Sequence, residues 1–206
     1  MIWQNGILLS PGAILPGDLV YQGMRIWDPG RSKVAALCYL HTPDEPPVTG
    51  ARILYLGAAA GSTVSFLSDY AEVVYAVEFS SRPARDLVRL AHSRSNIIPL
   101  FEDARYPERY LPFVELVDVL IQDIAQRDQA EIVIRNLVFL RDGGHLILFL
   151  KLLSMGVQKN REEMIENVVQ LLGHAGISGI RIINLERYHT GHVAVWGIYC
   201  PGQKSD

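Results

Sequence analysis

The chain has 206 residues, of which 49% are hydrophobic and 20% charged, and its net charge is −3. This composition is typical of a folded domain, and the longest apolar stretch, near residues 146–150, is far too short to cross a bilayer. The slight acidity argues against a protein that binds a nucleic-acid backbone over a large surface without partners. A few local cations can still serve a reaction on RNA if partner proteins supply most of the phosphate binding.

The sequence indicates a cytoplasmic protein without a membrane segment or a metal site. Its first residues lack the basic segment, apolar core and cleavage site of a secretory signal. Cys38 and Cys200 have no metal-ligand spacing, and the histidines show no ligand spacing with cysteines or acids. We therefore expect reduced, buried thiols and no metal centre.

Residues 1–24 are expected to form a small β-rich appendage, and residues 25–206 one larger domain. The first segment contains short apolar pieces separated by Asn5-Gly6, Ser10-Pro11-Gly12 and Pro16-Gly17, which are typical turn sequences. A helix is expected over residues 31–40, followed by a linker at 43–50.

Strands and helices then alternate, which predicts a doubly wound α/β fold. We expect strands over residues 52–56, 73–77, 97–100, 117–121 and 144–150, and helices over 62–70, 82–93, 107–110, 126–140 and 161–174. The last strands, 180–185 and 193–199, are separated by a turn and should pair antiparallel at the sheet edge. The expected fold is a Rossmann-like sheet of seven strands with the last one antiparallel, as in S-adenosylmethionine-dependent methyltransferases.

The segment that follows the first of these strands predicts a nucleoside site. It has the pattern Gly-x-x-x-Gly, and Glu78 follows the next strand about twenty residues later, where it can accept hydrogen bonds from ribose hydroxyls. A dinucleotide site usually carries Gly-x-Gly-x-x-Gly, so this spacing favours a single adenosine, as in S-adenosylmethionine. The candidate loop residues are Gly57, Ala58, Gly61, Ser62 and Thr63.

Each of the five predicted parallel strands is followed by a candidate for this site, where ligands of doubly wound sheets bind. Besides Gly57 and Glu78, these are Asp103, Asp123 and Lys151. Phe79 could pack on adenine and Asp103 could bind its amino group, with Asp123 near the reactive end of the ligand. The ordinary alternatives are strand-end acids, helix caps and a core aromatic ring.

Three further residues have a placement that suggests chemistry. Lys151 ends an apolar strand, where an ammonium is costly unless it is paired, and Asp123 is the expected partner. Lys33 opens a helix, where its charge opposes the helix dipole. His192 begins the last strand. The alternatives to a chemical role are that the two lysines lie at solvent-exposed edges and that the histidine fills the edge of the core.

The chain resembles the fibrillarin family, the methyltransferases of box C/D ribonucleoproteins, and is similar in length to its short archaeal members. The resemblance runs from about residue 25 to 199. It rests on residues 25–33 (RIWDPGRSK), 54–63, 74–80 (VYAVEFS), 96–99 (NIIP), 102–105 (EDAR), 123–126 (DIAQ) with Gln129, and 143–151. The chain departs from the family at Gly30, Arg127, residues 152–156 and Gly191.

The resemblance implies transfer of a methyl group from S-adenosylmethionine to a ribose 2′-hydroxyl of rRNA or tRNA, chosen by a guide RNA. It implies a Nop-domain scaffold protein, a kink-turn-binding protein of the ribosomal type and a box C/D guide RNA as partners. Carried over by position, the residues around the cofactor are Gly57, Ala58, Thr63, Glu78, Phe79, Asp103, Ala104, Asp123 and Gln126. A polar tetrad would consist of Lys33, Asp123, Lys151 and His192.

The chemistry explains why two lysines would be useful. The reacting hydroxyl must lose its proton, and two neighbouring ammonium groups lower each other's pKa, which makes one neutral lysine available as a base. We assign this role to Lys151. Two other functions stay open: a methyltransferase for protein or small molecules, which would not need both lysines, and a structural subunit that has lost turnover. The methylated nucleotides would be encoded in the guide RNA.

Overall fold

A computed structural model of the chain describes residues 1–40, 45–152 and 160–202. The expected linker at residues 43–50 lies partly outside the described residues. So does most of the segment 152–156 that departs from the fibrillarin pattern.

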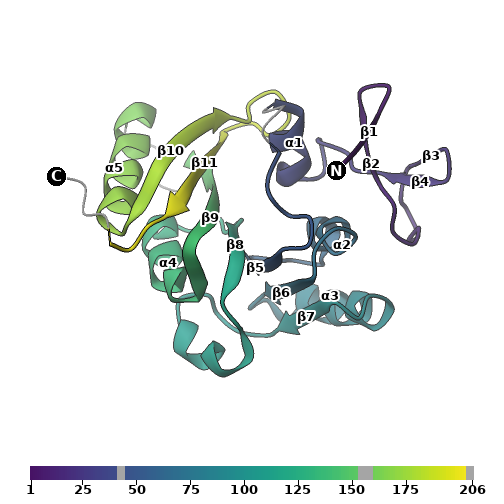
Figure 1. Cartoon of the computed structure of the whole chain (residues 1–206), viewed down its shortest axis with the longest axis horizontal. Helices are drawn as coiled ribbons and strands as arrows, with labels where there is room; N and C mark the ends of the chain where they lie inside the picture. Colours follow the sequence, from purple (N-terminus) through teal and green to yellow (C-terminus); the bar gives the residue numbers. More distant parts are fainter. Residues whose placement is uncertain (41–44, 153–159, 203–206) are drawn as a thin grey trace.

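A seven-stranded sheet forms the centre of the molecule (Figure 1), in the order β10-β11-β9-β8-β5-β6-β7. The pairs β9–β8, β8–β5, β5–β6 and β6–β7 are parallel, whereas β11 is antiparallel to both of its neighbours. The strands are β5 (Arg52–Leu56), β6 (Val73–Val77), β7 (Ile97–Leu100), β8 (Val117–Gln122), β9 (Leu140–Lys151), β10 (Ile177–Asn184) and β11 (His192–Tyr199). The predicted fold, with its last strand reversed, is confirmed.

Alternating side chains of the strands build a core on each face of this sheet. In β5, Ile53 belongs to the cluster that includes Val34 and Leu37, whereas Leu54 belongs to the cluster that includes Val133 and Val168. The first two partners lie on α1 (Lys33–Leu40), and the other two on α4 (Gln129–Asn136) and α5 (Arg161–His174). The remaining helices are α2 (Ser62–Leu67), α3 (Ser81–Ser93) and the 3₁₀ turns η1 (Pro107–Arg109), η2 (Leu111–Phe113) and η3 (Leu137–Phe139).

The segment between β8 and α4 differs from the expected elements. We predicted a helix from residue 126, but α4 begins at Gln129. Asp128, just before it, is bound by Arg105, whose Nε donates to Oδ2 over 2.9 Å. The segment 123–128 is therefore a loop at the carboxyl end of β8, which is where ligands of such sheets bind.

The N-terminal segment forms a four-stranded sheet in the order β1-β2-β4-β3. Its strands are β1 (Ile2–Gln4), β2 (Ile7–Ser10), β3 (Val20–Tyr21) and β4 (Met24–Ile26). Asn5-Gly6 and Gln22-Gly23 connect the two outer hairpins, and all four residues have the positive φ angles of a type I′ turn. In Figure 1 this sheet lies beside α1 and α2, on the side of the molecule away from α5.

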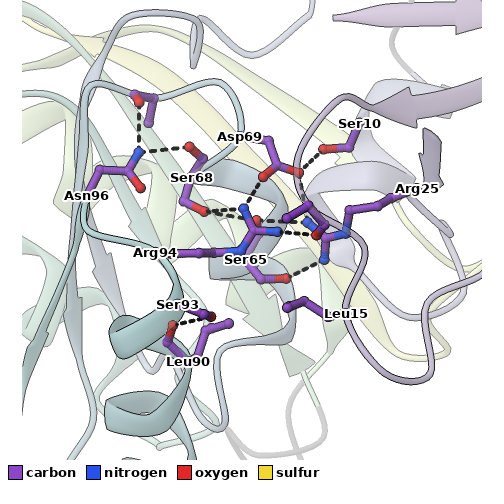
Figure 2. Close-up of polar contacts among 12 residues, drawn as sticks. Ser10, Leu15, Arg25, Ser65, Ser68, Asp69, Leu90, Ser93, Arg94 and Asn96 are labelled. Atoms are coloured by element: carbon purple, nitrogen blue, oxygen red, sulfur yellow. Dashed lines mark hydrogen bonds and ion pairs between the residues drawn. The ribbon is translucent and has the colours of Figure 1, made fainter. Parts of the chain in front are cut away.

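Buried charges join this small sheet to the ends of α2 and α3 (Figure 2). Arg25 on β4 is fully buried, and its Nη1 lies 2.7 Å from Oδ2 of Asp69. Its Nε lies 2.6 Å from Oδ2 of Asp18. Asp69, just beyond α2, also pairs with Arg94 at the end of α3 and accepts a hydrogen bond from Ser10. We call Arg25, Asp69 and Arg94 the buried ion triad. It connects β4 with the ends of two helices of the larger domain.

The structure also bears on the thiols and on membrane segments. Within the described ranges, no helix is long and apolar enough to span a membrane, and no three His, Cys, Asp or Glu side chains are grouped to hold a metal ion. Cys38 and Cys200 are both free thiols. Cys38 is fully buried, and this burial raises the pKa of its thiol well above the usual value. Cys200 is only partly buried.

Candidate active site

The loop between β5 and α2 adopts a backbone that depends on its glycines. Gly57, Ala59 and Gly61 have φ angles of 84°, 49° and 87°. A Cβ atom on Gly57 would lie only 2.5 Å from the carbonyl oxygen of Asp123. Glycine is needed at this position for two reasons. Its backbone has a left-handed φ, and the loop after β8 passes directly against it.

Replacing Gly57 by alanine should sharply weaken binding of S-adenosylmethionine. The left-handed φ costs alanine about 1–2 kcal/mol, and the new methyl group must also displace the backbone of Asp123. Gly50→Ala is a matched control, because Gly50 has a φ of 68° but open space around it. Calorimetric titration should show at least a tenfold loss of affinity for Gly57→Ala and little change for the control. Equal affinities in the two variants would contradict this account.

A cavity of about 290 Å³ lies next to this loop, at the carboxyl ends of β5, β6 and β8. This size is close to the lower end of small-ligand pockets. Seven of the predicted cofactor residues line it: Gly57, Glu78, Phe79, Asp103, Ala104, Asp123 and Gln126. The residues Ala59, Ser80, Pro83, Arg105, Ile124, Ala125 and Ile132 contribute to its walls as well.

The other predicted cofactor residues lie around the same loop but not in the wall of this cavity. Gly61 and Ser62 line a neighbouring cavity of about 170 Å³ between α2 and the N-terminal sheet. Ala58 is buried, and the hydroxyl of Thr63 donates to Oγ of Ser32 over 3.2 Å. In the structure these four residues shape the loop and anchor it to the segment before α1.

Glu78 is held rigidly at the edge of the cavity. It is only 7% exposed, and its two carboxylate oxygens accept hydrogen bonds from the backbone N–H groups of Ala59 (2.9 Å) and Ser80 (2.7 Å). Each oxygen keeps a second lone pair, so the carboxylate can also accept hydrogen bonds from two hydroxyls of a ribose. Phe79 next to it is 55% exposed, which leaves a ring face available for stacking.

Arg105 fixes the opposite wall of the cavity, and the sequence analysis did not assign it a role. Its Nη1 pairs with Asp103 over 3.4 Å, its Nη2 donates to Oε1 of Gln126 over 3.2 Å, and its Nε binds Asp128. The hydrogen bond and charge of Arg105 outweigh the opposing effect of burial and lower the pKa of Asp128. The side chain of Arg105 thus holds two of the predicted cofactor residues, Asp103 and Gln126.

An ion pair joins two members of the predicted polar tetrad, but it is not the expected one, because Asp123 pairs with Lys33 instead of Lys151. The Nζ atom of Lys33, at the start of α1, lies 2.8 Å from both carboxylate oxygens of Asp123, which follows β8. Both side chains are partly buried, with 18% and 25% exposure. Lys33 is therefore fixed at the site by a two-fold contact, although 90 positions separate it from Asp123 in the chain.

Lys151 and His192 lie opposite each other where β9 and β11 pair. The backbone of Lys151 is fixed by the fully buried Gln129, whose Oε1 accepts from the N–H of Lys151 over 3.0 Å and whose Nε2 donates to its carbonyl over 3.4 Å. The structure thus gives Gln129, which the sequence analysis quoted only as part of a motif, the task of positioning Lys151. A polar residue on the inner face of an expected helix was the available signal.

The imidazole of His192 lies within the electrostatic range of the other three members of the predicted tetrad. Burial lowers the pKa of its imidazole, and the charges of Lys33 and Lys151 act in the same direction, whereas the hydrogen bond to the carbonyl of Thr190 and the charge of Asp123 oppose this shift. Burial also lowers the pKa of His189, assisted by Lys33. His189 binds the carbonyl oxygen of Pro29 through Nε2 over 2.9 Å. His192 is therefore a neutral side chain beside the two lysines at neutral pH.

The lowered histidine pKa values predict a loss of stability in mild acid. The unfolded chain takes up a proton at each histidine near pH 6.5, whereas the folded chain takes it up only at lower pH. Stability should therefore fall as the pH drops from about 6.5 towards 5. In His189→Gln the slope of stability against pH should decrease by up to one proton. Denaturant titrations at several pH values measure it, and an unchanged slope in the variant would contradict the expectation.

Comparison with known proteins matches residues 18–201 to the family described as Fibrillarin. The chain belongs to the fibrillarin family. It is 77% identical over 199 residues to a fibrillarin-like rRNA/tRNA 2′-O-methyltransferase of Methanospirillum hungatei, with 97% of this chain and 96% of the relative covered. The family resemblance expected from the sequence is confirmed.

Solved structures of fibrillarins have the same fold. Fibrillarin of Aeropyrum pernix with natively bound S-adenosyl-L-methionine is 38% identical, with a TM-score of 0.80 and 91% of this chain and 85% of that chain covered. The fibrillarin of a fibrillarin/Nop5p complex is 35% identical, with a TM-score of 0.84 and 94% and 93% covered. The structural match therefore extends over nearly the whole of this fibrillarin-family chain.

Proposed function

We propose that this fibrillarin-family protein transfers the methyl group of S-adenosylmethionine to ribose 2′-hydroxyls of rRNA and tRNA, as the catalytic subunit of a box C/D ribonucleoprotein. The observation that carries this proposal is the Lys33–Asp123 ion pair at the cofactor cavity, with Lys151 and His192 beside it. It is supported by the name of the 77% identical relative and by the bound S-adenosylmethionine of the Aeropyrum pernix protein.

The residues of the cavity suit S-adenosylmethionine. Glu78 retains acceptor capacity for the ribose hydroxyls, and the exposed ring of Phe79 can stack on adenine. Asp103 and Gln126 have oxygen atoms for the adenine amino group and are steadied by Arg105. Gly57 keeps the loop free of side-chain atoms at its closest approach to Asp123. When bound, the cofactor supplies a sulfonium methyl group that is already activated for transfer.

The tetrad divides the remaining work between its lysines. Lys33 is engaged with both oxygens of Asp123, so losing its proton would leave that carboxylate without its partner. The Nζ atom of Lys151 has no acidic partner within 4 Å among the residues described, so it can accept the proton of the 2′-hydroxyl without breaking an ion pair. We assign Lys151 as the base, and the Lys33–Asp123 pair as the group that orients the hydroxyl.

In this proposal, partner molecules supply most of the RNA binding. We propose a Nop-domain scaffold protein as one partner, because a relative forms a complex with Nop5p. A kink-turn-binding protein of the ribosomal type, a box C/D guide RNA and the target rRNA or tRNA complete the assembly. A net charge of −3 agrees with this division of labour. We further propose the cytoplasm as the location, and residues 1–24 as a support for a catalytic domain at 25–206.

A methylation assay with and without the partners tests this proposal. The isolated chain should bind S-adenosylmethionine but methylate RNA poorly, and addition of the scaffold protein, kink-turn protein and guide RNA should give methylation at the guided nucleotide. Replacing the guide with one of different sequence should move the methylated position. Strong site-specific methylation by the chain alone, or transfer to a protein or small molecule instead of RNA, would contradict the proposal.

A further inference from the structure

The solvent face of α3 carries a row of basic side chains. Arg82, Arg85, Arg89 and His92 follow one another at intervals of three, four and three residues, which places them on one side of the helix. All four are exposed, whereas Ala84 and Leu87 on the other side are buried. We call these four residues the α3 basic row.

The charge of this row is largely uncompensated. Neither Arg82 nor Arg85 has an acidic partner within 4 Å in the part of the chain that the structure describes. Arg89 pairs with Asp86 over 2.8 Å, and both side chains of this pair are at least half exposed. Other exposed arginines are paired with acids, for example Arg52 with Glu72 and Arg141 with Asp118. The row therefore concentrates positive charge on a protein that is acidic as a whole.

The row begins at the mouth of the cofactor cavity. Helix α3 starts directly after Glu78, Phe79 and Ser80, which line that cavity, and Pro83 in its first turn lines it too. The position of α3 is fixed by packing and by charge, because Leu87 is buried in the core and Arg94 at its end belongs to the buried ion triad. The basic side chains thus project from a fixed support that extends away from the site of methyl transfer.

We propose that the α3 basic row binds successive phosphates of the RNA that is held at the active site. This inference rests on the proposed function. The proposed function requires that RNA is bound, and the inference names the surface that binds it. Arginines one helical turn apart are separated by about 5.4 Å, so they can follow a backbone of regularly repeated phosphates. A protein interface would need an apolar centre, and Val88 is the only large apolar side chain of α3 that is clearly exposed.

The experiment compares two double variants in the reconstituted ribonucleoprotein. Arg82→Gln/Arg85→Gln removes the two unpaired charges of the row, and Arg52→Gln/Arg141→Gln removes two exposed arginines at the amino ends of β5 and β9. Single-turnover methylation is measured against target RNA concentration at several salt concentrations, with S-adenosylmethionine affinity and melting temperature as further readouts.

We expect the row variant to need about tenfold more target RNA for half-maximal rate, equally for two different target sequences, while its maximal rate and cofactor affinity stay unchanged. Each lost phosphate contact should reduce the magnitude of the slope of log affinity against log salt concentration by about one, so the double variant should reduce it by about two. The control should match the unmodified protein. Identical RNA dependence in the two variants would overturn the inference, as would failure of the row variant to assemble with the scaffold protein before RNA is added. An unmodified particle without any methylation would instead refute the proposed function.

Discussion

Replacing Lys151 by arginine should reduce methyl transfer by a factor of about 10² to 10⁴, the usual contribution of a positioned general base. Arginine keeps the positive charge at this position but stays protonated, so it cannot accept the proton of the 2′-hydroxyl. Lys151→Met should show a similar loss. Neither change touches the cofactor cavity, so both variants should bind S-adenosylmethionine with the affinity of the unmodified protein. Single-turnover methylation in the assembled particle measures the rates, and calorimetry measures the binding.

Arg141→Met provides the matched control for Lys151, because Arg141 lies on the same strand, β9, at its other end. Its side chain is 59% exposed and pairs with Asp118 over 2.9 Å. This variant should methylate at close to the normal rate. An added small amine should partly restore the activity of Lys151→Met, because it can occupy the vacated space and accept the proton. A Lys151→Arg protein with more than a third of the normal rate would show that Lys151 acts only through its charge.

Replacing Arg25 by methionine should lower the free energy of unfolding by about 3–5 kcal/mol, because it leaves the buried carboxylate of Asp69 with one fewer partner. The guanidinium also donates to the carbonyl and hydroxyl oxygens of Ser65 on α2, and lies 3.9 Å from the ring centre of Phe66. For a chain of this size the melting temperature should fall by roughly 10 °C. Denaturant titration and thermal melting measure the effect.

Arg52→Met is the control for Arg25, because Arg52 also makes ion pairs with two acids, Glu72 at 3.3 Å and Glu115 at 3.5 Å, but is 41% exposed. Pairs of this kind contribute about 0–1 kcal/mol. Arg25→Lys should be intermediate, since an ammonium cannot contact Asp18 and Asp69 with separate nitrogen atoms. Equal stabilities of Arg25→Met and Arg52→Met would show that the buried ion triad does not hold the N-terminal sheet on the larger domain.

The number and direction of the strands in the main sheet could be predicted from the sequence, because strong apolar runs alternate with helical patterns and a turn marks the last hairpin. The predicted ends of several helices and strands differ from those in the structure. The helix α4 begins three residues later than expected, since Arg105 binds Asp128 from a distant part of the chain. Periodicity along the sequence carries no information about such a contact.

The candidate site was predictable where it follows strand ends, and less so where long-range packing decides it. Glu78 and Asp123 follow β6 and β8, so their place at the cavity could be expected. Gln129 and Arg105 act through contacts 22 and 23 residues away in the chain. A polar residue on the inner face of an expected helix marked Gln129, but no local pattern shows which groups either side chain contacts. The same holds for the buried ion triad, because Arg25 appeared in the sequence only as the first residue of a matching segment.

Transfer of a labelled methyl group to two guide-paired target RNAs tests the central claim most directly. The RNAs differ only at the guided nucleotide, which carries a 2′-hydroxyl in one and is 2′-deoxy in the other. We expect the assembled particle to label the first RNA at that ribose and to leave the second unlabelled, and Lys151→Arg to label neither. Equal labelling of both RNAs would show that the methyl group goes to another atom, and it would contradict the account.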